Sequence, residues 1–187
     1  RQPPRVIDAG RVTGSDGRTT WFACVLSAGF AAVVNERANL MRWPRGRSRY
    51  NLALLRELAV LKPISYRLTL DGVVLETRAM LVAVGNNVSL GGGMRAVPDA
   101  KLDDGLLDVL VVQPLSRTAF LRIFPRVFKG THVSDSRVSI VRVRSIRIEA
   151  DAVVAYAAGE RVGPLPIDVD VVPAALRVLA PTTATVS

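Results

Sequence analysis

The sequence contains very little cysteine and histidine, which excludes several kinds of protein. Cys24 is the only cysteine among the 187 residues, so no disulfide can form within the chain. His132 is the only histidine and lies far from Cys24 in sequence, which leaves no cluster with the ligand spacing of a zinc site. A cystine-rich secreted scaffold is therefore excluded, and a reducing compartment is compatible with the composition.

The chain also lacks an apolar run well suited to crossing a membrane. Its longest uncharged run, residues 19–35, reaches only the low end of the ~17 to 25 residues that a spanning helix needs. The run also contains Ser27 and Gly29. We interpret it as a buried strand followed by the start of a helix. The first residue is Arg1 and no signal pattern follows, so we expect the sequence to be part of a longer protein.

Basic residues are abundant. Twenty-five lysines and arginines against 16 aspartates and glutamates give a net charge of +9, which implies attraction to a polyanionic surface. The 49% hydrophobic and 22% charged content argues against disorder, and the length suits one domain of ordinary size. Anionic phospholipid, nucleic acid and phosphorylated substrates all remain possible partners at this point.

Most of the sequence predicts β-strands separated by turns. Stretches rich in β-branched residues predict strands over residues 5–13, 18–27, 65–70, 74–86, 106–112, 138–150, 153–157, 166–172 and 175–180. Asp71-Gly72 predicts a type I′ hairpin turn, since both central positions of that turn require a positive φ. The alternation of apolar and polar residues slips after Ile140, which predicts a β-bulge.

Three helical patterns interrupt the strands, at residues 31–41, 48–61 and 116–129. Ser116 is the expected N-cap of the third, and Pro125 inside it predicts a kink or two short helices. We therefore predict a mainly β fold, a β-sandwich with a few peripheral helices. It forms a single domain, residues 1–187, with its core from about residue 6 to 181.

Two loops carry candidate ligands. Gly91, Gly92 and Gly93 follow Asn86, and consecutive glycines indicate either a tight turn with positive φ or a close approach of a ligand or another domain to the backbone. The loop is not a P-loop, because no lysine-serine or lysine-threonine pair follows it. Residues 103–105, Asp-Asp-Gly, are a turn signal before a strand, and binding of a hard cation is the less frequent alternative.

Residues 41–50 concentrate arginine with two aromatic residues. This composition suits an anionic membrane surface, nucleic acid or simply a solvated corner between helices. The candidate surface residues are Arg42, Trp43, Arg45, Arg47 and Arg49. Glu160 follows an apolar strand, where a general base is possible but a surface turn is commoner. We expect His132 to be a surface or hydrogen-bonded core residue.

The order of these motifs resembles the C-terminal domain of bacterial diacylglycerol kinases, members of the lipid kinase superfamily that includes sphingosine and ceramide kinases. The resemblance extends from about Val6 to Pro181. The matching motifs are S-A-G-F at 27–30, Arg49-Tyr50, G-N-N-x-x-x-G-G-G at 85–93, P-D-A-K-L-D-D-G-L-L-D-V at 98–109, Gly159-Glu160, and V-P-A-A-L-R-V-L-A-P at 172–181.

The resemblance implies a two-domain enzyme with its active site in the cleft between the domains. In this family an N-terminal domain binds ATP through a G-G-D-G-T loop, and no such motif occurs here. The chain would supply the wall of the lipid site, with cleft candidates Gly29, Asn86, Gly91, Gly92 and Gly93. The resemblance also implies a structural Mg²⁺ held by the Lys101 carbonyl, the Asp104 side chain and the Leu106 carbonyl.

The family's catalytic base lies in an Asp-Gly-Glu or Asp-Gly-Asp element, which reads Ala158-Gly159-Glu160 here. Glu160 is then the expected base for transfer of the γ-phosphate of ATP to diacylglycerol, giving phosphatidic acid. The implied setting is cytoplasmic and peripheral to the membrane. Implied partners are the lipid substrate, an anionic membrane, the protein's own nucleotide domain and a second copy in a homodimer, but no nucleic acid. The alternative is a non-catalytic basic module that binds anionic lipid or nucleic acid through residues 42–50.

Overall fold

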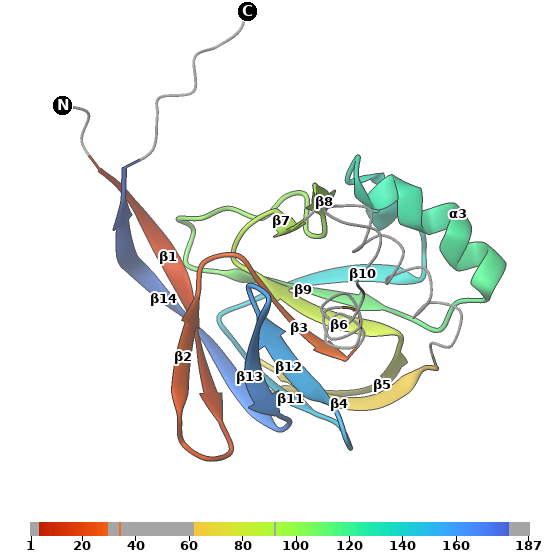
Figure 1. The fold of residues 1–187 in the computed structure, drawn as a ribbon, viewed down its shortest axis with the longest axis horizontal. Helices are drawn as coiled ribbons and strands as arrows, with labels where there is room; N and C mark the ends of the chain where they lie inside the picture. The colour runs from red at the N-terminus through yellow and green to blue at the C-terminus, as the bar shows by residue number, and fades with distance from the viewer. Residues whose placement is uncertain (1–3, 30–33, 35–61, 92, 180–187) are drawn as a thin grey trace, which may run out of the picture.

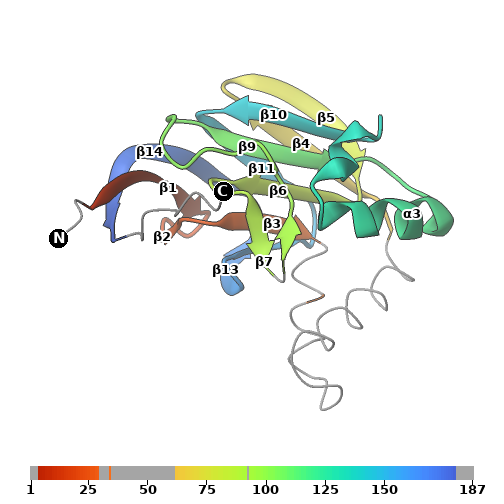
Figure 2. The same cartoon turned by 90° about the horizontal axis from the view of Figure 1, so that it is seen from above.

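The computed structural model describes residues 4–29, 34, 62–91 and 93–179. Its strands form two six-stranded antiparallel sheets, drawn in Figure 1 and viewed from above in Figure 2. The first sheet has the order β2 (Thr19–Phe22), β1 (Arg5–Gly14), β14 (Ile167–Val178), β11 (Ser145–Glu149), β4 (Ile64–Leu70) and β5 (Val73–Ala79). The second has the order β10 (Val138–Val143), β9 (Leu107–Val112), β6 (Leu81–Gly85), β3 (Val25–Gly29), β12 (Val154–Ala157) and β13 (Glu160–Pro164).

The main apolar core joins residues from both sheets, which confirms the predicted β-sandwich. Large side chains from the two sheets are almost completely buried in it, among them Leu26, Leu68, Leu107, Ile146, Ile148 and Ile167. A second cluster, containing Ala83, Val97 and Leu110, packs on alternate residues of β6 and β9. All six residues of β9 are buried, because apolar side chains pack against both of its faces.

Three runs that the sequence presents as single strands each divide between the two sheets. Residues 18–27 form β2 in the first sheet and β3 in the second, with Ala23 and Cys24 between them. The run 74–86 divides at Met80 into β5 and β6, and the run 138–150 divides at Arg144 into β10 and β11. The predicted bulge after Ile140 is wrong, because β10 pairs with β9 without a register shift. The apolar pattern changes because both faces of β10 are partly covered: Val138 and Ile140 pack with the second cluster, whereas Val143 belongs to the main core.

The predicted hairpin turn is confirmed. Leu70 of β4 is paired with Val73 of β5 across a two-residue loop, and Asp71 and Gly72 have φ values of 45° and 87°. The Asp71 carboxylate also accepts hydrogen bonds from the backbone N–H groups of Arg144, at 3.0 Å, and Ser145, at 2.8 Å. This turn therefore also holds the corner at which the chain passes from β10 to β11.

The third helical pattern is confirmed as α3 (Arg117–Val127), followed by the short 3₁₀ helix η1 (Thr131–Ser134). The hydroxyl of Ser116 caps it by accepting the backbone N–H of Ala119 at 3.2 Å. Pro125 lies inside one continuous helix, so of the two predicted alternatives the division into two short helices does not occur. No helix in the described residues is long and apolar enough to cross a membrane. Apart from Val34, the helices predicted at 31–41 and 48–61 lie outside the described residues.

Two further strands, β7 (Ser89–Gly91) and β8 (Met94–Arg95), pair with each other in a small separate sheet. They enclose the glycine-rich loop. Gly93 in this loop has a φ of 85°, so the loop uses the backbone freedom that the sequence predicted for it.

Candidate active site

One end of the second sheet carries five of the predicted site residues that the structure describes. Arg142 in β10 is paired with Asp108 in β9, and Asp108 is paired in turn with Gly85 at the end of β6. Gly85 pairs with Val25 at the start of β3, and the Val25 carbonyl accepts the N–H of Ala158 at 3.2 Å in the turn before β13. This row of residues, the end row, brings the Glu160 turn, Asn86 and the Lys101–Leu106 loop to the same end of the sandwich.

A buried carboxylate in β1 fastens the Lys101–Leu106 loop. Asp8 is only 4% exposed, and its Oδ2 accepts the N–H of Gly105 at 2.7 Å while its own N–H donates to the Leu102 carbonyl at 2.7 Å. Its Oδ1 accepts the N–H of Ala174 in β14 at 2.8 Å, where the pairing of β1 with β14 shifts register. Asp8 is thus a positioning residue for the loop.

Asn86 is hydrogen-bonded to the backbone of Asp8. It is fully buried, its Nδ2 donates to the Asp8 carbonyl at 2.9 Å, and its N–H donates to the Cys24 carbonyl at 2.9 Å. Its Oδ1 has no hydrogen-bond partner among the described residues. The amide therefore fixes the end of β6 to β1 and β3 and serves to build the site's frame.

The side chain of Asp104 contacts an arginine in the neighbouring strand. Arg142 donates to Asp104 Oδ2, and its Nε lies 3.6 Å from Oδ1 of the buried Asp108. Burial raises the pKa of the Asp108 carboxyl; Arg142 opposes this effect, and Asp104 and Asp99 add to it. One guanidinium therefore offsets a local group of carboxylates beside the loop.

The chemistry of the loop fits a hard cation with few protein ligands. The Lys101 carbonyl, the Asp104 carboxylate and the Leu106 carbonyl are oxygen donors, which Mg²⁺ prefers, with water as the usual remaining ligand. Asp104 Oδ1 accepts the N–H of Leu106 at 3.2 Å, so the carboxylate folds back over the loop. The described residues contain no group of three or more histidine, cysteine, aspartate or glutamate side chains able to hold a metal. Mg²⁺ would thus depend on carbonyls and would compete with Arg142 for Asp104.

Glu160 lies at the tip of a tight hairpin. Ala157 pairs with Glu160 across Ala158 and Gly159, whose φ values of 51° and 88° identify a type I′ turn. The Glu160 side chain is exposed, so a substrate hydroxyl could reach it. In the described residues no hydrogen bond or ion pair joins Glu160 to the Lys101–Leu106 loop. The loop leads into β9, and four strand spacings of about 4.8 Å separate β13 from β9, so base and loop occupy different parts of the end row.

The structure separates Gly29 from the other cleft candidates. Because β3 and β6 are antiparallel and Gly29 pairs with Leu81, Gly29 lies at the opposite end of the strands from Asn86. A Cβ on Gly29, whose φ is 98°, would lie 2.6 Å from the Tyr66 hydroxyl, which donates to the Ala28 carbonyl at 3.1 Å. Packing against Tyr66 therefore accounts for this glycine.

Several candidates lie outside the described residues: Gly92, Arg42, Trp43, Arg45, Arg47 and Arg49. Gly91 ends β7 and Gly93 follows in the loop between β7 and β8. Sequence reasoning missed Asp8 and Arg142. Asp8 in the pattern V-I-D-A-G gave a signal, since it is a carboxylate within an otherwise apolar stretch of a predicted strand.

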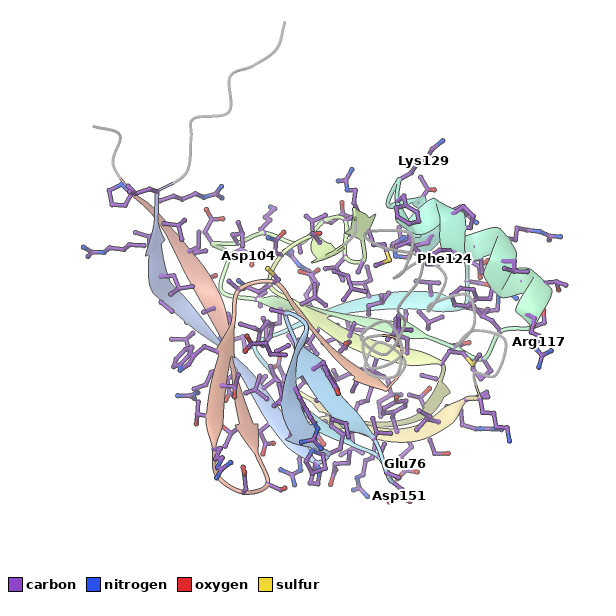
Figure 3. The ribbon with its side chains drawn as sticks, in the orientation of Figure 1. Glu76, Asp104, Arg117, Phe124, Lys129 and Asp151 are labelled. Carbon is purple, nitrogen blue, oxygen red and sulfur yellow. The ribbon has the colours of Figure 1, made fainter. Side chains whose placement is uncertain are left out.

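A hollow of about 510 Å³ lies elsewhere, beside β4 and β5 of the first sheet. Two arginines and three carboxylates are among the residues that line it: Arg67, Arg78, Glu76, Glu149 and Asp151. Figure 3 shows Glu76 and Asp151 at this lower edge, away from Asp104. None of the sequence-predicted site residues lines the hollow, and its mixed charge favours neither an anion nor a cation.

Comparisons with known proteins agree with the fold. Diacylglycerol kinase of Mycobacterium tuberculosis is 45% identical to this chain over 176 residues, which cover 94% of this chain and 57% of the relative. A probable lipid kinase YegS-like protein of Stenotrophomonas maltophilia is 30% identical over 132 residues, covering 70% of this chain and 42% of the relative. The chain thus spans about half the length of the curated relatives it matches.

The fold is also similar to that of a solved structure, a putative diacylglycerol kinase from Bacillus anthracis. The TM-score is 0.65 at 24% identity, and the match covers 91% of this chain and 54% of that one. The model of the YegS C-terminal NAD kinase beta sandwich-like domain matches residues 24–180, which include Asn86, the Lys101–Leu106 loop and Glu160. The chain therefore belongs to the family of proteins that carry this domain, whose relatives are named as diacylglycerol kinases and lipid kinases.

Proposed function

We propose that this chain is the lipid-substrate and catalytic-base domain of an ATP-dependent lipid kinase that converts diacylglycerol to phosphatidic acid. The observation that carries the proposal is the 45% identity, over nearly the whole chain, to the diacylglycerol kinase of M. tuberculosis. The protein's own nucleotide-binding domain, an anionic membrane and a second copy of the chain are its proposed partners.

In the proposed reaction the lipid hydroxyl attacks the γ-phosphorus of ATP. The new P–O bond forms while the bond from the γ-phosphorus to the β–γ bridging oxygen breaks, and ADP leaves with that oxygen. The hydroxyl proton passes to a carboxylate oxygen of Glu160. Phosphoryl transfer depends mainly on alignment and charge neutralisation, so the base must be held in place near the hydroxyl. The type I′ turn and the hydrogen bond from Ala158 to Val25 fix the backbone beside Glu160.

Mg²⁺ at the Lys101–Leu106 loop would supply a fixed positive charge between the two carbonyls and the Asp104 carboxylate. The strand spacing between this loop and Glu160 supports a structural role for the site. Asp8 holds the loop from the side of β1, because its carboxylate accepts the Gly105 N–H at 2.7 Å.

The magnesium site is testable without measuring activity. We expect MgCl₂ to raise the melting temperature of the protein, and Asp104→Asn to abolish that increase. Arg142→Gln is the matched control on the other side of the ion pair: removing the competing guanidinium should strengthen the response to Mg²⁺. An equal response in the wild type and in Asp104→Asn would show that Mg²⁺ does not bind there.

The base is tested by Glu160→Gln in the complete two-domain enzyme. We expect turnover to fall by about two orders of magnitude or more, because the proton acceptor is lost, with little change in melting temperature at this exposed position. Glu76→Gln, an exposed change on β5 of the other sheet, is the control and should leave turnover unchanged. Normal turnover in Glu160→Gln would remove Glu160 from the proposal.

A further inference from the structure

The outer face of α3 combines exposed apolar side chains with basic ones. Leu121 is 56% exposed and Phe128, which follows the helix, is 37% exposed. Leu121 and Pro125 are four residues apart and Phe128 is seven from Leu121, so all three lie on one face. Ile123 is the only residue of the helix that is buried, which leaves this face turned away from the core.

Cations border this apolar strip. Arg117 lies at the start of the helix, Arg122 lies beside the strip, and Lys129 lies just beyond the helix end; all three are exposed. None of them has a carboxylate within ion-pair distance in the described part of the chain. The sequence from Pro114 to Ser134 contains no acidic residue. Figure 3 shows Arg117 and Lys129 at opposite ends of the helix, both directed away from the sheets.

The helix can present this face as a rigid surface. The rings of Phe120 and Phe124 stack at 5.7 Å, and those of Phe124 and Phe128 meet edge to face at 5.6 Å. At the C-terminal end the Arg126 guanidinium donates to the Thr131 carbonyl at 2.8 Å, which ties α3 to η1. An apolar strip with flanking cations on a rigid helix is the pattern of a helix that lies in the surface of an anionic bilayer.

We propose that the α3 face, defined as Arg117, Leu121, Arg122, Phe128 and Lys129, docks the protein on a bilayer containing anionic phospholipid. The proposal extends the proposed function, since a lipid kinase must reach its substrate in a membrane. Leu121 and Phe128 enter the boundary between head groups and acyl chains, and the three cations contact lipid phosphates.

The α3 face and the proposed catalytic base lie at opposite ends of the second sheet. β9 runs from Asp108 in the end row to Val112, and α3 begins after Val112, at the opposite end of the second sheet from Glu160. In Figure 3, α3 lies on the right and Asp104 to its left. A nucleotide domain that meets the Glu160 end row would therefore leave the α3 face free for a membrane.

The test is sedimentation of the intact protein with vesicles of phosphatidylcholine, with and without phosphatidylglycerol, at low and at physiological salt. We expect binding only to the anionic vesicles and weaker binding at higher salt. Arg117→Gln combined with Arg122→Gln should weaken binding about 30-fold at low salt, which corresponds to about fivefold for each cation. Leu121→Ser should weaken it about tenfold.

The controls match the change in charge and in exposed apolar area at other places. Arg18→Gln with Arg177→Gln removes two exposed cations from β1–β2 and β14, and Val73→Ser removes a 69% exposed side chain from β5. Both should bind vesicles within about twofold of the wild type. Unchanged circular dichroism and melting temperature would confirm that each variant is folded.

Three outcomes would overturn the proposal. Vesicle binding by the α3 variants equal to that of the controls would show that another surface docks. If the α3 variants bound DNA more weakly than the wild type but bound vesicles equally well, α3 would be a nucleic-acid surface. A lower melting temperature of the longer protein with unchanged vesicle binding would show that α3 packs against another part of it. Because Glu160→Gln should bind vesicles normally, a failure of docking and a failure of the kinase proposal are distinguishable.

Discussion

His132 is a buried side chain whose protonation opposes folding. It is 2% exposed, and its Nε2–H donates to the Ala96 carbonyl at 2.9 Å while Nδ1 has no partner among the described residues. Burial lowers the pKa of His132, and the nearby Arg126 lowers it further, although the bond to Ala96 acts in the opposite direction. The unfolded chain therefore binds the proton more readily than the folded protein.

We predict that His132 lowers the free energy of unfolding as the pH falls through and below about 6.5, the ordinary histidine pKa. Above that pH, protonation of His132 does not reduce the free energy of unfolding. The measurement is the urea midpoint at pH 7.5 and pH 5.5 for the wild type and for His132→Gln. Since the chain has no other histidine, the variant should lose most of this pH dependence. An equal pH dependence in both proteins would contradict the assignment.

Ala158 has a backbone conformation that suits it poorly. Its φ of 51° places an ordinary L-residue in the left-handed region, which costs about 1–2 kcal/mol, whereas asparagine and aspartate adopt that region more readily. The aspartate that the family resemblance leads one to expect at this position would therefore suit the turn as well as supply a charge.

Ala158→Asn should raise the free energy of unfolding by about 0.5–1 kcal/mol, because it relieves the turn without adding charge. Gly159→Ala should lower it by about 1 kcal/mol: φ there is 88° and no atom lies within 4 Å of the added Cβ, so backbone strain alone accounts for the loss. Urea denaturation of both variants provides the measurement. No gain in Ala158→Asn would mean that the turn tolerates alanine without strain.

Single residues were predicted best where their role depends on neighbours in sequence. The Asp71-Gly72 turn and the Ser116 cap require only local geometry, and both are confirmed. Asp8 and Arg142 were missed because their partners are distant in sequence: Ala174 lies 166 residues from Asp8, and Asp104 lies 38 residues from Arg142. No periodicity encodes such contacts.

At the scale of elements, most strands were predicted, but β7, β8 and β13 were missed, and the division of the strands between the two sheets was not predicted. The runs 166–172 and 175–180, predicted as two strands, form the single strand β14. The three runs divided at residues 23–24, Met80 and Arg144 have the composition of strands on both sides of the corner. A corner without glycine or proline carries no local turn signal, because tertiary packing on two different sheets determines where it bends. The sequence could therefore predict a β-sandwich without predicting how its strands are shared between the sheets.

The Asp71 carboxylate makes one of these corners specific. It accepts backbone N–H groups from Arg144 and Ser145 across more than seventy residues of sequence, in addition to occupying the hairpin turn. Asp71→Ala should lower the free energy of unfolding by about 1–3 kcal/mol, since two backbone donors lose their acceptor and alanine takes a positive φ. Asp71→Asn should lose less, because it keeps an acceptor oxygen and tolerates that φ.

The control for the corner is Asp16→Ala in the turn between β1 and β2. In an exposed position, Asp16 accepts the backbone N–H of Arg18 at 3.0 Å, and its Oδ2 lies 3.5 Å from Arg18 Nε, so both of these contacts are with a residue two positions away. Guanidinium denaturation should therefore show a smaller loss for Asp16→Ala than for Asp71→Ala. Equal losses would mean that the contact of Asp71 with residues 144–145 adds nothing beyond the local turn.

At the scale of the whole molecule, the candidate site is a row on one end of a sheet with no described surface opposite it. Glu160 is exposed there, while Asp8 and Asn86, which brace the same end, are buried. An exposed base cannot by itself align a hydroxyl with the γ-phosphate, and phosphoryl transfer depends on that alignment. The proposed kinase activity therefore requires a nucleotide-binding surface that faces this end row.

This requirement leads to a prediction about the two parts of the enzyme. The 187-residue chain alone should not transfer phosphate from ATP to diacylglycerol, whereas a chimera with the part of the M. tuberculosis kinase that this chain does not match should do so. The 45% identity over 94% of this chain makes compatible domain surfaces a reasonable expectation. Transfer of radiolabelled phosphate to diacylglycerol in mixed micelles is the measurement, and Glu160→Gln in the chimera is the inactive control. Phosphorylation by the isolated chain would contradict the argument, because an end row with no opposing surface would then suffice to bind and align ATP. An inactive chimera that binds ATP and has the melting temperature of its parents would contradict it equally, because the end row would then fail to complete the kinase site.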